Sequence, residues 1–178
     1  MRTIPGLLLL LLTAFPAISN SQSPELYGAG GPTITDAGNS VAAGAGFSPT
    51  SHWTLVFNVE RTHLSSQTTR EGDVISSFRG GTLFLGTAEV RFAPFGRGRF
   101  GPFGLAGVAA GVSRPNVNAR FPSRVTNEVR AMFAGGGVEV PLTERISAFA
   151  DARVMLGMEG VEGMIGVAPL RAGVACRF

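Results

Sequence analysis

The residues from Gly166 to Phe178 restrict the fold of this chain more than any other stretch. Taken two at a time, one face of the segment carries only apolar side chains, those of Ala168, Leu170, Ala172, Val174, Cys176 and Phe178. The opposite face carries Pro169, Arg171, Gly173, Ala175 and Arg177. Because side chains alternate between the faces of a strand, this pattern predicts a β-strand with one apolar face and one face that accepts charge. The apolar face points into a core in a soluble sandwich and at lipid in a membrane barrel.

The N-terminus has the pattern of a secretory signal peptide. Arg2 precedes the apolar run from Leu7 to Leu12, and small residues follow at Ala17 and Ser19. The run is too short to span a bilayer as a helix, so we expect residues 1–21 to be removed. Residues 22–178 are then of the size of one domain.

Composition favours a closed β-sheet for that domain. The chain has 25 Gly and 13 Phe, while only 15% of its residues are charged. Glycine, aromatic and short alternating apolar residues suit a barrel, and the composition is not that of a disordered or ordinary helical protein. After the signal, no apolar stretch is long enough for a membrane-spanning helix.

Alternation and turn residues predict eight strands, of which the first has the weakest pattern. The expected strands are 23–31, 40–48, 53–64, 79–92, 100–112, 128–140, 145–156 and 166–178. Long connections (32–39, 65–77, 113–127 and 158–164) alternate with tight turns (49–51, 94–98 and 141–144). An even number of antiparallel strands, with long loops at one end and short turns at the other, is typical of outer-membrane barrels. The sequence therefore predicts an all-β, eight-stranded antiparallel up-and-down transmembrane β-barrel.

The terminal segment resembles the C-terminal signal by which bacterial outer-membrane barrels are recognised for insertion. In this interpretation the signal residues are Leu170, Ala172, Val174, Cys176 and Phe178. The layout of residues 22–178 is similar to that of the small OmpA/OmpX-type barrels. The resemblance implies a monomer in the bacterial outer membrane that contacts lipid and lipopolysaccharide. It also implies the barrel-assembly machinery as a partner during insertion.

An outward apolar face would turn several charged residues into the lumen, namely Glu60, Glu89, Arg91, Glu139, Asp151, Arg153 and Arg171. Eight strands leave room only for side chains, and unpaired charges there would be costly. We therefore expect an interior network of Arg–carboxylate ion pairs that fills the barrel, with a switchable pair gating a thin conductance as the alternative. Leu83 and Leu85 fall on the same face, which predicts either a bulge or an apolar plug near the rim.

A catalytic interpretation would use His63 and Ser65, which share a face, with Glu60 or Glu71 as the orienting acid. The His-x-Ser pattern resembles that of lipid A 3-O-deacylases, which are also eight-stranded barrels. The motif lies on the third strand instead of near the end, and the family's following Asn/Pro/Gly/Glu pattern is missing. We therefore expect no enzymatic activity, with a deacylase-like hydrolase as the minor alternative.

No metal or cofactor is expected, because two histidines and the single Cys176 supply no ligand set. All 15 basic residues are arginines dispersed along the chain, which does not favour nucleic-acid binding. The main alternative is a secreted soluble barrel that binds a small apolar ligand inside. The favoured function is a structural or surface-interaction role carried by loops 65–77 and 113–127, the second of which contains Arg114, Arg120 and Arg124.

Overall fold

The computed structural model describes residues 23–34, 38–65, 67–71, 74–78, 80–96, 99–117, 125–160 and 163–178. The predicted signal peptide lies outside these residues, as do Arg120 and Arg124. Among the described residues, no helix is long and apolar enough to cross a membrane. The strands are β1 (Pro24–Pro32), β2 (Asn39–Phe47), β3 (Trp53–Leu64), β4 (Gln67–Glu71), β5 (Val74–Phe78), β6 (Gly81–Phe92), β7 (Gly101–Pro115), β8 (Asn127–Pro141), β9 (Ile146–Glu159), β10 (Gly163–Val167) and β11 (Leu170–Arg177).

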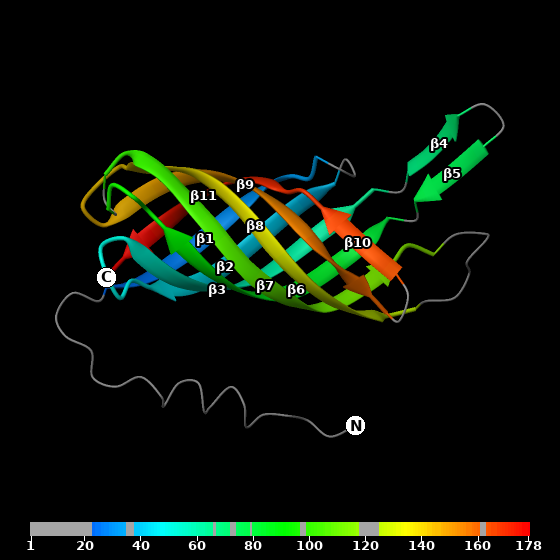
Figure 1. Ribbon diagram of the computed structural model, residues 1–178, viewed down its shortest axis with the longest axis horizontal. Coiled ribbons are helices and arrows are strands. Elements are labelled where there is room, and N and C mark those ends of the chain that lie inside the picture. The colour runs from blue at the N-terminus through cyan, green and yellow to red at the C-terminus, as the bar shows by residue number, and fades with distance from the viewer. Residues whose placement is uncertain are drawn as a thin grey trace, which may run out of the picture.

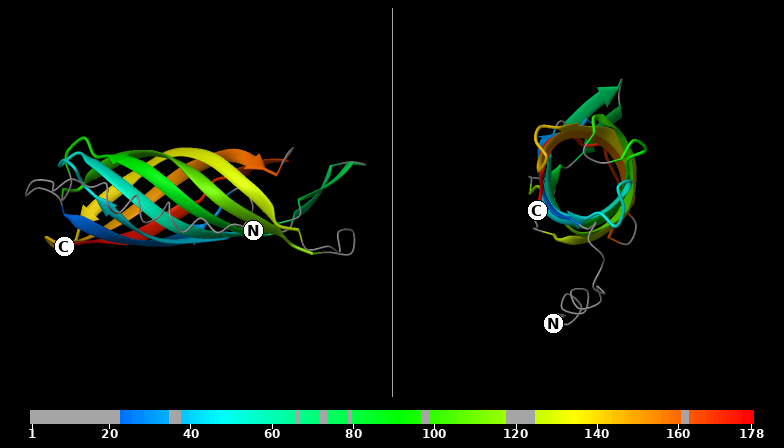
Figure 2. Two further views of the ribbon diagram at one scale, coloured as in Figure 1. Left: turned by 90° about the horizontal axis from the view of Figure 1, so that it is seen from below. Right: turned by 90° about the vertical axis from the view of Figure 1, so that its left-hand side faces the viewer.

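The main sheet closes on itself as an antiparallel barrel. Its hydrogen-bonded order runs β1-β2-β3-β6-β7-β8-β9, then β10 and β11, and β11 pairs with β1. The view along the axis in Figure 2 shows the closed ring. With β10 and β11 counted as two parts of one strand, this is the predicted eight-stranded up-and-down barrel.

The eighth strand is interrupted without a change of register. Val167 pairs with Met155 and Leu170 pairs with Ala152, so equal numbers of residues separate these pairs on both strands. Pro169 lies in the gap and has no N–H to donate to the ladder. Its carbonyl still accepts a hydrogen bond of 3.2 Å from the Arg153 amide, which holds the two parts in line.

The first strand is regular despite its weak sequence pattern. β1 pairs with β2 along its whole length and with β11 on its other side. Leu26 lies opposite Cys176, and Ala29 lies opposite Gly173. The small residues of β1 are therefore part of the closed wall, as topology required.

One long connection differs from the prediction. Residues 65–77 were expected to form an exposed loop, but β4 and β5 pair as a separate two-stranded sheet. Figure 1 shows this hairpin projecting from the end of the barrel opposite the C-terminus. Strands β7 and β9 also extend to Pro115 and Glu159, three residues further than expected in each case.

The two faces of the wall have the predicted polarity. In β3, Thr54, Asn58, Glu60 and Thr62 are buried in the lumen, while Trp53, Phe57 and Val59 are exposed outside. In the last strand, Arg171 is buried, whereas Leu170 and Val174 are exposed. The apolar band therefore covers the outside of the barrel.

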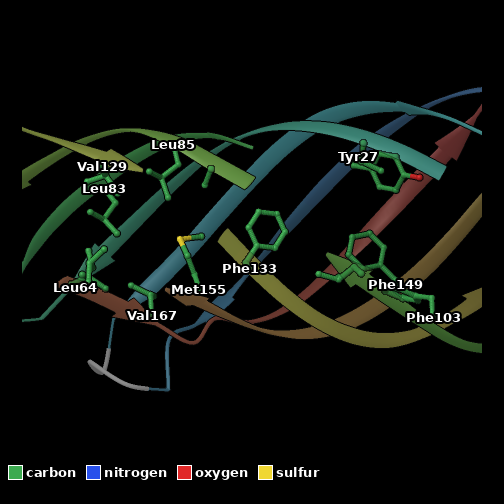
Figure 3. Packing of buried hydrophobic residues seen from close by; sticks show 14 of the residues in the cluster. Tyr27, Leu64, Leu83, Leu85, Phe103, Val129, Phe133, Phe149, Met155 and Val167 are labelled. Carbon is green, nitrogen blue, oxygen red and sulfur yellow. The ribbon is translucent and has the colours of Figure 1, made fainter. Parts of the chain in front are cut away.

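Apolar side chains also occupy both ends of the lumen. Figure 3 shows one group at the loop end (Leu64, Leu83, Leu85, Val129, Met155 and Val167) and another at the turn end (Tyr27, Phe103 and Phe149), with Phe133 between them. The pairing of β3 with β6 is continuous from Trp53↔Phe92 to Leu64↔Gly81. Leu83 and Leu85 therefore belong to an apolar plug, and the alternative of a bulge is wrong.

Candidate functional site

Six of the seven predicted lumen charges lie in one connected chain of ion pairs. Four strands contribute: β3 (Glu60), β6 (Glu89 and Arg91), β9 (Asp151 and Arg153) and β11 (Arg171). Arg91 Nε contacts Glu89 at 2.6 Å, and Arg153 Nη1 lies 3.0 Å from the other oxygen of Glu89. Arg153 Nε also lies 3.2 Å from Asp151. The structure thus links charges that are far apart in sequence.

Arg171 continues this chain toward β3. Its Nη2 lies 3.0 Å from Asp151 and its Nη1 lies 3.2 Å from Glu60. Glu60 accepts further hydrogen bonds from Ser40 at 2.8 Å and Thr62 at 3.0 Å. All six charged side chains are buried, so each carboxylate depends on these contacts for its stability.

Aromatic rings contact two arginines of this chain of ion pairs, Arg91 at its end and Arg153 near its middle. The Arg91 guanidinium lies 4.7 Å from the ring centroid of Tyr27, 4.9 Å from that of Phe149 and 5.3 Å from that of Phe103. Arg153 lies 4.9 Å from the ring of Phe133. A cation over the face of an aromatic ring is attracted by the ring quadrupole. These rings therefore stabilise the guanidinium groups of Arg91 and Arg153 in addition to their ion pairs.

Glu139 is not part of the six-residue chain of ion pairs. It contacts Arg177 at the turn end, and Arg177 Nε also lies 3.1 Å from Glu25. Tyr27 donates its hydroxyl hydrogen bond to Glu25. The predicted set did not include Glu25 or Arg177. Parity along the last strand places Arg177 on the same face as Arg171, which is the signal that could have found it.

The six-residue chain of ion pairs lies between the two apolar groups. On β9, Asp151 and Arg153 stand between Phe149 and Met155; on β6, Glu89 and Arg91 follow Leu85. On the last strand, Arg171 of β11 lies between Val167 of β10 and Ala175 of β11. Charges enclosed in this way have little access to water, so their mutual attraction is less screened than on a surface.

Among the described side chains of the catalytic alternative, the structure separates His63 from Glu60. His63 is exposed on the outer wall, with its Nδ1 3.5 Å from the Thr82 hydroxyl oxygen. Glu60 lies on the opposite face, inside the lumen, bonded to Arg171. Glu60 therefore cannot orient His63, and no side-chain position is described for Glu71.

Among the described residues there is no group of three or more His, Cys, Asp or Glu side chains that could hold a metal ion. Cys176 is a free thiol on the outer face, paired across strands with Leu26 and Ile146. Both of these cross-strand neighbours are apolar.

Aromatic residues are exposed outside at the turn end of the barrel. Trp53 and Phe92 pack with ring centroids 4.7 Å apart, and both are outward-facing. Phe178, Phe95 and Phe100 are also exposed near this end. Aromatic side chains at this level form the girdle of membrane barrels.

No family model and no curated protein sequence matches the chain. Among solved structures, the chain is similar to the N-terminal β-barrel domain of Pseudomonas aeruginosa OprF, with 18% identity, a TM-score of 0.64 and coverage of 88% of this chain and 97% of that one. Neisserial surface protein A gives 15% identity, a TM-score of 0.59 and coverage of 88% and 96%. A major outer membrane protein from Thermus thermophilus gives 13% identity, a TM-score of 0.60, and coverage of 89% and 100%. The fold is thus that of the eight-stranded outer-membrane β-barrels.

Proposed function

We propose that this protein is a monomeric barrel of the bacterial outer membrane with a structural or surface-interaction role and no catalytic activity. The wall crosses the membrane, the lumen is filled, and segments at the loop end make the external contacts. The role requires no cofactor, and its lipid partners are the outer-membrane lipids, including lipopolysaccharide.

The observation that carries this proposal is the inverted polarity of the wall. The fully buried side chains include Glu25, Glu60, Asp151 and Arg153, while exposed ones include Phe57, Val108, Met132, Val154 and Val174. A soluble barrel that binds an apolar ligand needs the reverse arrangement. An apolar exterior is favoured in hydrocarbon, and an interior of paired charges is the usual content of a narrow membrane barrel.

The interior supports a filling role over conduction. Apolar side chains at both ends enclose a chain of paired charges, and an eight-stranded barrel is only wide enough for its own side chains. The arginines and carboxylates then join strands β3, β6, β9 and β11 across the lumen. This network stabilises the barrel instead of gating a pore.

The loop end supports the surface role. The β4–β5 hairpin extends beyond the barrel (Figure 1), and Arg114 at the end of β7 is exposed. Segment 65–77, which contains this hairpin, and the connection from β7 to β8 are long, and binding residues are concentrated on such segments when a rigid scaffold presents them.

For insertion, we assign recognition by the barrel-assembly machinery to the outward residues of β11 and Phe178. Leu170, Ala172 and Val174 are exposed on the outer wall, and Phe178 is exposed beside the turn end. Deleting Phe178 is expected to lower the amount of barrel in cellular outer membranes while leaving refolding in detergent unchanged. An unchanged amount in cells would contradict this role.

The test of the membrane proposal places a charge on the outer band. Val108, at the centre of β7, is 59% exposed, and Val117, beyond the end of that strand, is 49% exposed. Val108→Arg should lower the free energy of unfolding in phosphatidylcholine vesicles by about 2–4 kcal/mol, because arginine at the bilayer midplane is poorly solvated. Val117→Arg should change it by about 0–1 kcal/mol. If both substitutions change the free energy of unfolding by the same small amount, the outer wall does not contact lipid and the membrane proposal is wrong.

A further inference from the structure

We propose that the outer wall at the loop end binds the phosphate group of a membrane lipid between Arg61 and Arg114. This inference rests on the proposed membrane position of the barrel. Arg61 belongs to β3 and Arg114 to β7, with β6 between them, and both side chains are exposed on the outer wall.

The two arginines flank one aromatic ring. The guanidinium carbon of Arg61 lies 5.9 Å from the Phe84 ring centroid, and that of Arg114 lies 5.6 Å from it. Arg61 is directly opposite Phe84 in the ladder, and Arg114 is opposite Thr82, the next outward residue of β6. One ring therefore holds two cations on the same patch of wall.

These arginines differ from the other arginines of the barrel strands in having no acidic partner among the residues that the structure describes. Arg91, Arg153, Arg171 and Arg177 each contact a carboxylate in the lumen, and exposed Arg130 lies 3.5 Å from Glu128. Within the described part of the chain, no carboxylate lies within ion-pair distance of Arg61 or Arg114. The nearest acid by register, Glu128 opposite Val112, is the partner of Arg130.

A groove lies on the wall beside the pair. It has a volume of about 690 Å³ and is lined by Val41, Val59, Arg61, His63 and Phe84, among others. A second groove of about 640 Å³ lies on the neighbouring strands, over Phe57, Gly86, Ala88 and Val108, and Arg130 of β8 also lines it. Arg61 and Arg114 thus lie at the loop end, and the apolar outer wall continues from them toward the turn end.

This arrangement fits an amphiphile that carries a phosphate. Arg61 lies three residues before the end of β3, so its side chain is near the edge of the apolar band, where polar headgroups begin. The planar guanidinium group donates two parallel hydrogen bonds to phosphate oxygens, and two such groups suit one phosphate. An acyl chain of the same lipid would lie in the first groove, along Val41, Val59 and Phe84.

The test measures lipid binding by native mass spectrometry of the full mature barrel in neutral detergent. The probe is dioleoylphosphatidic acid, and dioleoylglycerol, which has the same chains without phosphate, is the matched lipid. Arg61→Gln combined with Arg114→Gln should lower the apparent affinity for phosphatidic acid about tenfold or more. Arg145→Gln, an exposed arginine in the turn between β8 and β9 at the other end of the barrel, should change it by less than about twofold.

Three results would overturn the inference: equal affinity of the double variant and the unmodified barrel, equal affinity for dioleoylglycerol, or complete displacement of the lipid by an equal concentration of inorganic phosphate. A heat-dependent gel shift in every variant shows that the barrel is closed. If the closed barrel lacks phosphate selectivity, only this inference fails. If the mature protein stays folded and soluble without detergent, the membrane proposal fails with it.

Discussion

At the scale of single residues, Arg153 is the side chain on which the lumen depends most. It is 2% exposed, contacts both Glu89 and Asp151, and covers the ring of Phe133. Replacing it with an apolar side chain leaves two buried carboxylates with one cation fewer. The cost of an uncompensated buried charge exceeds the value of the pair itself.

Arg153→Met should therefore lower the free energy of unfolding by about 3–5 kcal/mol. The measurement is a urea titration of the barrel in phosphatidylcholine vesicles, followed by the fluorescence of its single tryptophan, Trp53. The matched variant Arg130→Met removes an exposed pair and should cost about 0–1 kcal/mol. Similar costs for the two variants would show that the lumen charges do not depend on each other.

The inward direction of the charged lumen residues could be predicted from the sequence, because side chains alternate between the two faces of each strand. The sequence did not predict which partner each charge takes. Arg171 reaches Glu60 on β3, 111 residues earlier, and only the closed ring and its register bring the two strands to opposite sides of one lumen. Glu25 was missed because β1 has too few large apolar residues to define its faces.

At the scale of single strands, glycines on the inner face allow close approach of neighbouring elements. A Cβ atom on Gly107 of β7 would lie 2.6 Å from the Phe133 ring and 2.9 Å from the Glu89 Cα atom of β6. Gly104 of the same strand faces outward, and a Cβ atom there would meet nothing within 4 Å. The two positions therefore differ in space, although they share a strand and a residue type.

Gly107→Ala is expected to lower the free energy of unfolding by about 1–3 kcal/mol, because both the Phe133 ring and the backbone of β6, whose Ala88 carbonyl oxygen would lie even closer to the new Cβ atom, must move. Gly104→Ala should be neutral or stabilise by up to about 1 kcal/mol, since alanine loses less backbone entropy than glycine in a strand. Both are measured by the same urea titration. Equal effects would show that the inner wall has room for a methyl group at Gly107.

Strand boundaries were predicted well where apolar and polar residues alternate, as in β3 and β9. The β4–β5 hairpin was not predicted, because residues 65–77 are mostly polar and show no apolar face. The hairpin follows β3 and precedes β6, and it continues their antiparallel path beyond the barrel (Figure 1). The effect of these two strands on residues 65–77 cannot be seen in the sequence pattern of the segment itself.

At the scale of the whole molecule, the barrel has an apolar outer band and a lumen in three layers. The two apolar groups of Figure 3 form the layers at the two ends. The six-residue chain of ion pairs forms the layer between them. Overall fold and polarity followed from alternation and from the order of loops and turns. The aromatic contacts of Arg91 did not, because they join β1, β6, β7 and β9 across the lumen.

A filled lumen predicts that small solutes do not pass. Vesicles containing the folded barrel should not swell in an isosmotic solution of a small sugar such as arabinose, because eight strands leave no aqueous channel beside the side chains. The comparison is with empty vesicles of the same lipid. Swelling faster than in the empty vesicles would contradict a filling role for the ion pairs.

If the outer wall contacts lipid, as proposed, the fluorescence of the single tryptophan should respond to quenchers placed in the bilayer. Trp53 is 46% exposed on the outer wall at the turn end, beside Phe92. In vesicles of brominated phosphatidylcholine, bromines close to the headgroup should quench its fluorescence more strongly than bromines near the chain ends, because the aromatic girdle lies at the interface. If no brominated lipid quenches Trp53, and aqueous acrylamide quenches it as fully as free tryptophan, the wall faces water and the account is wrong.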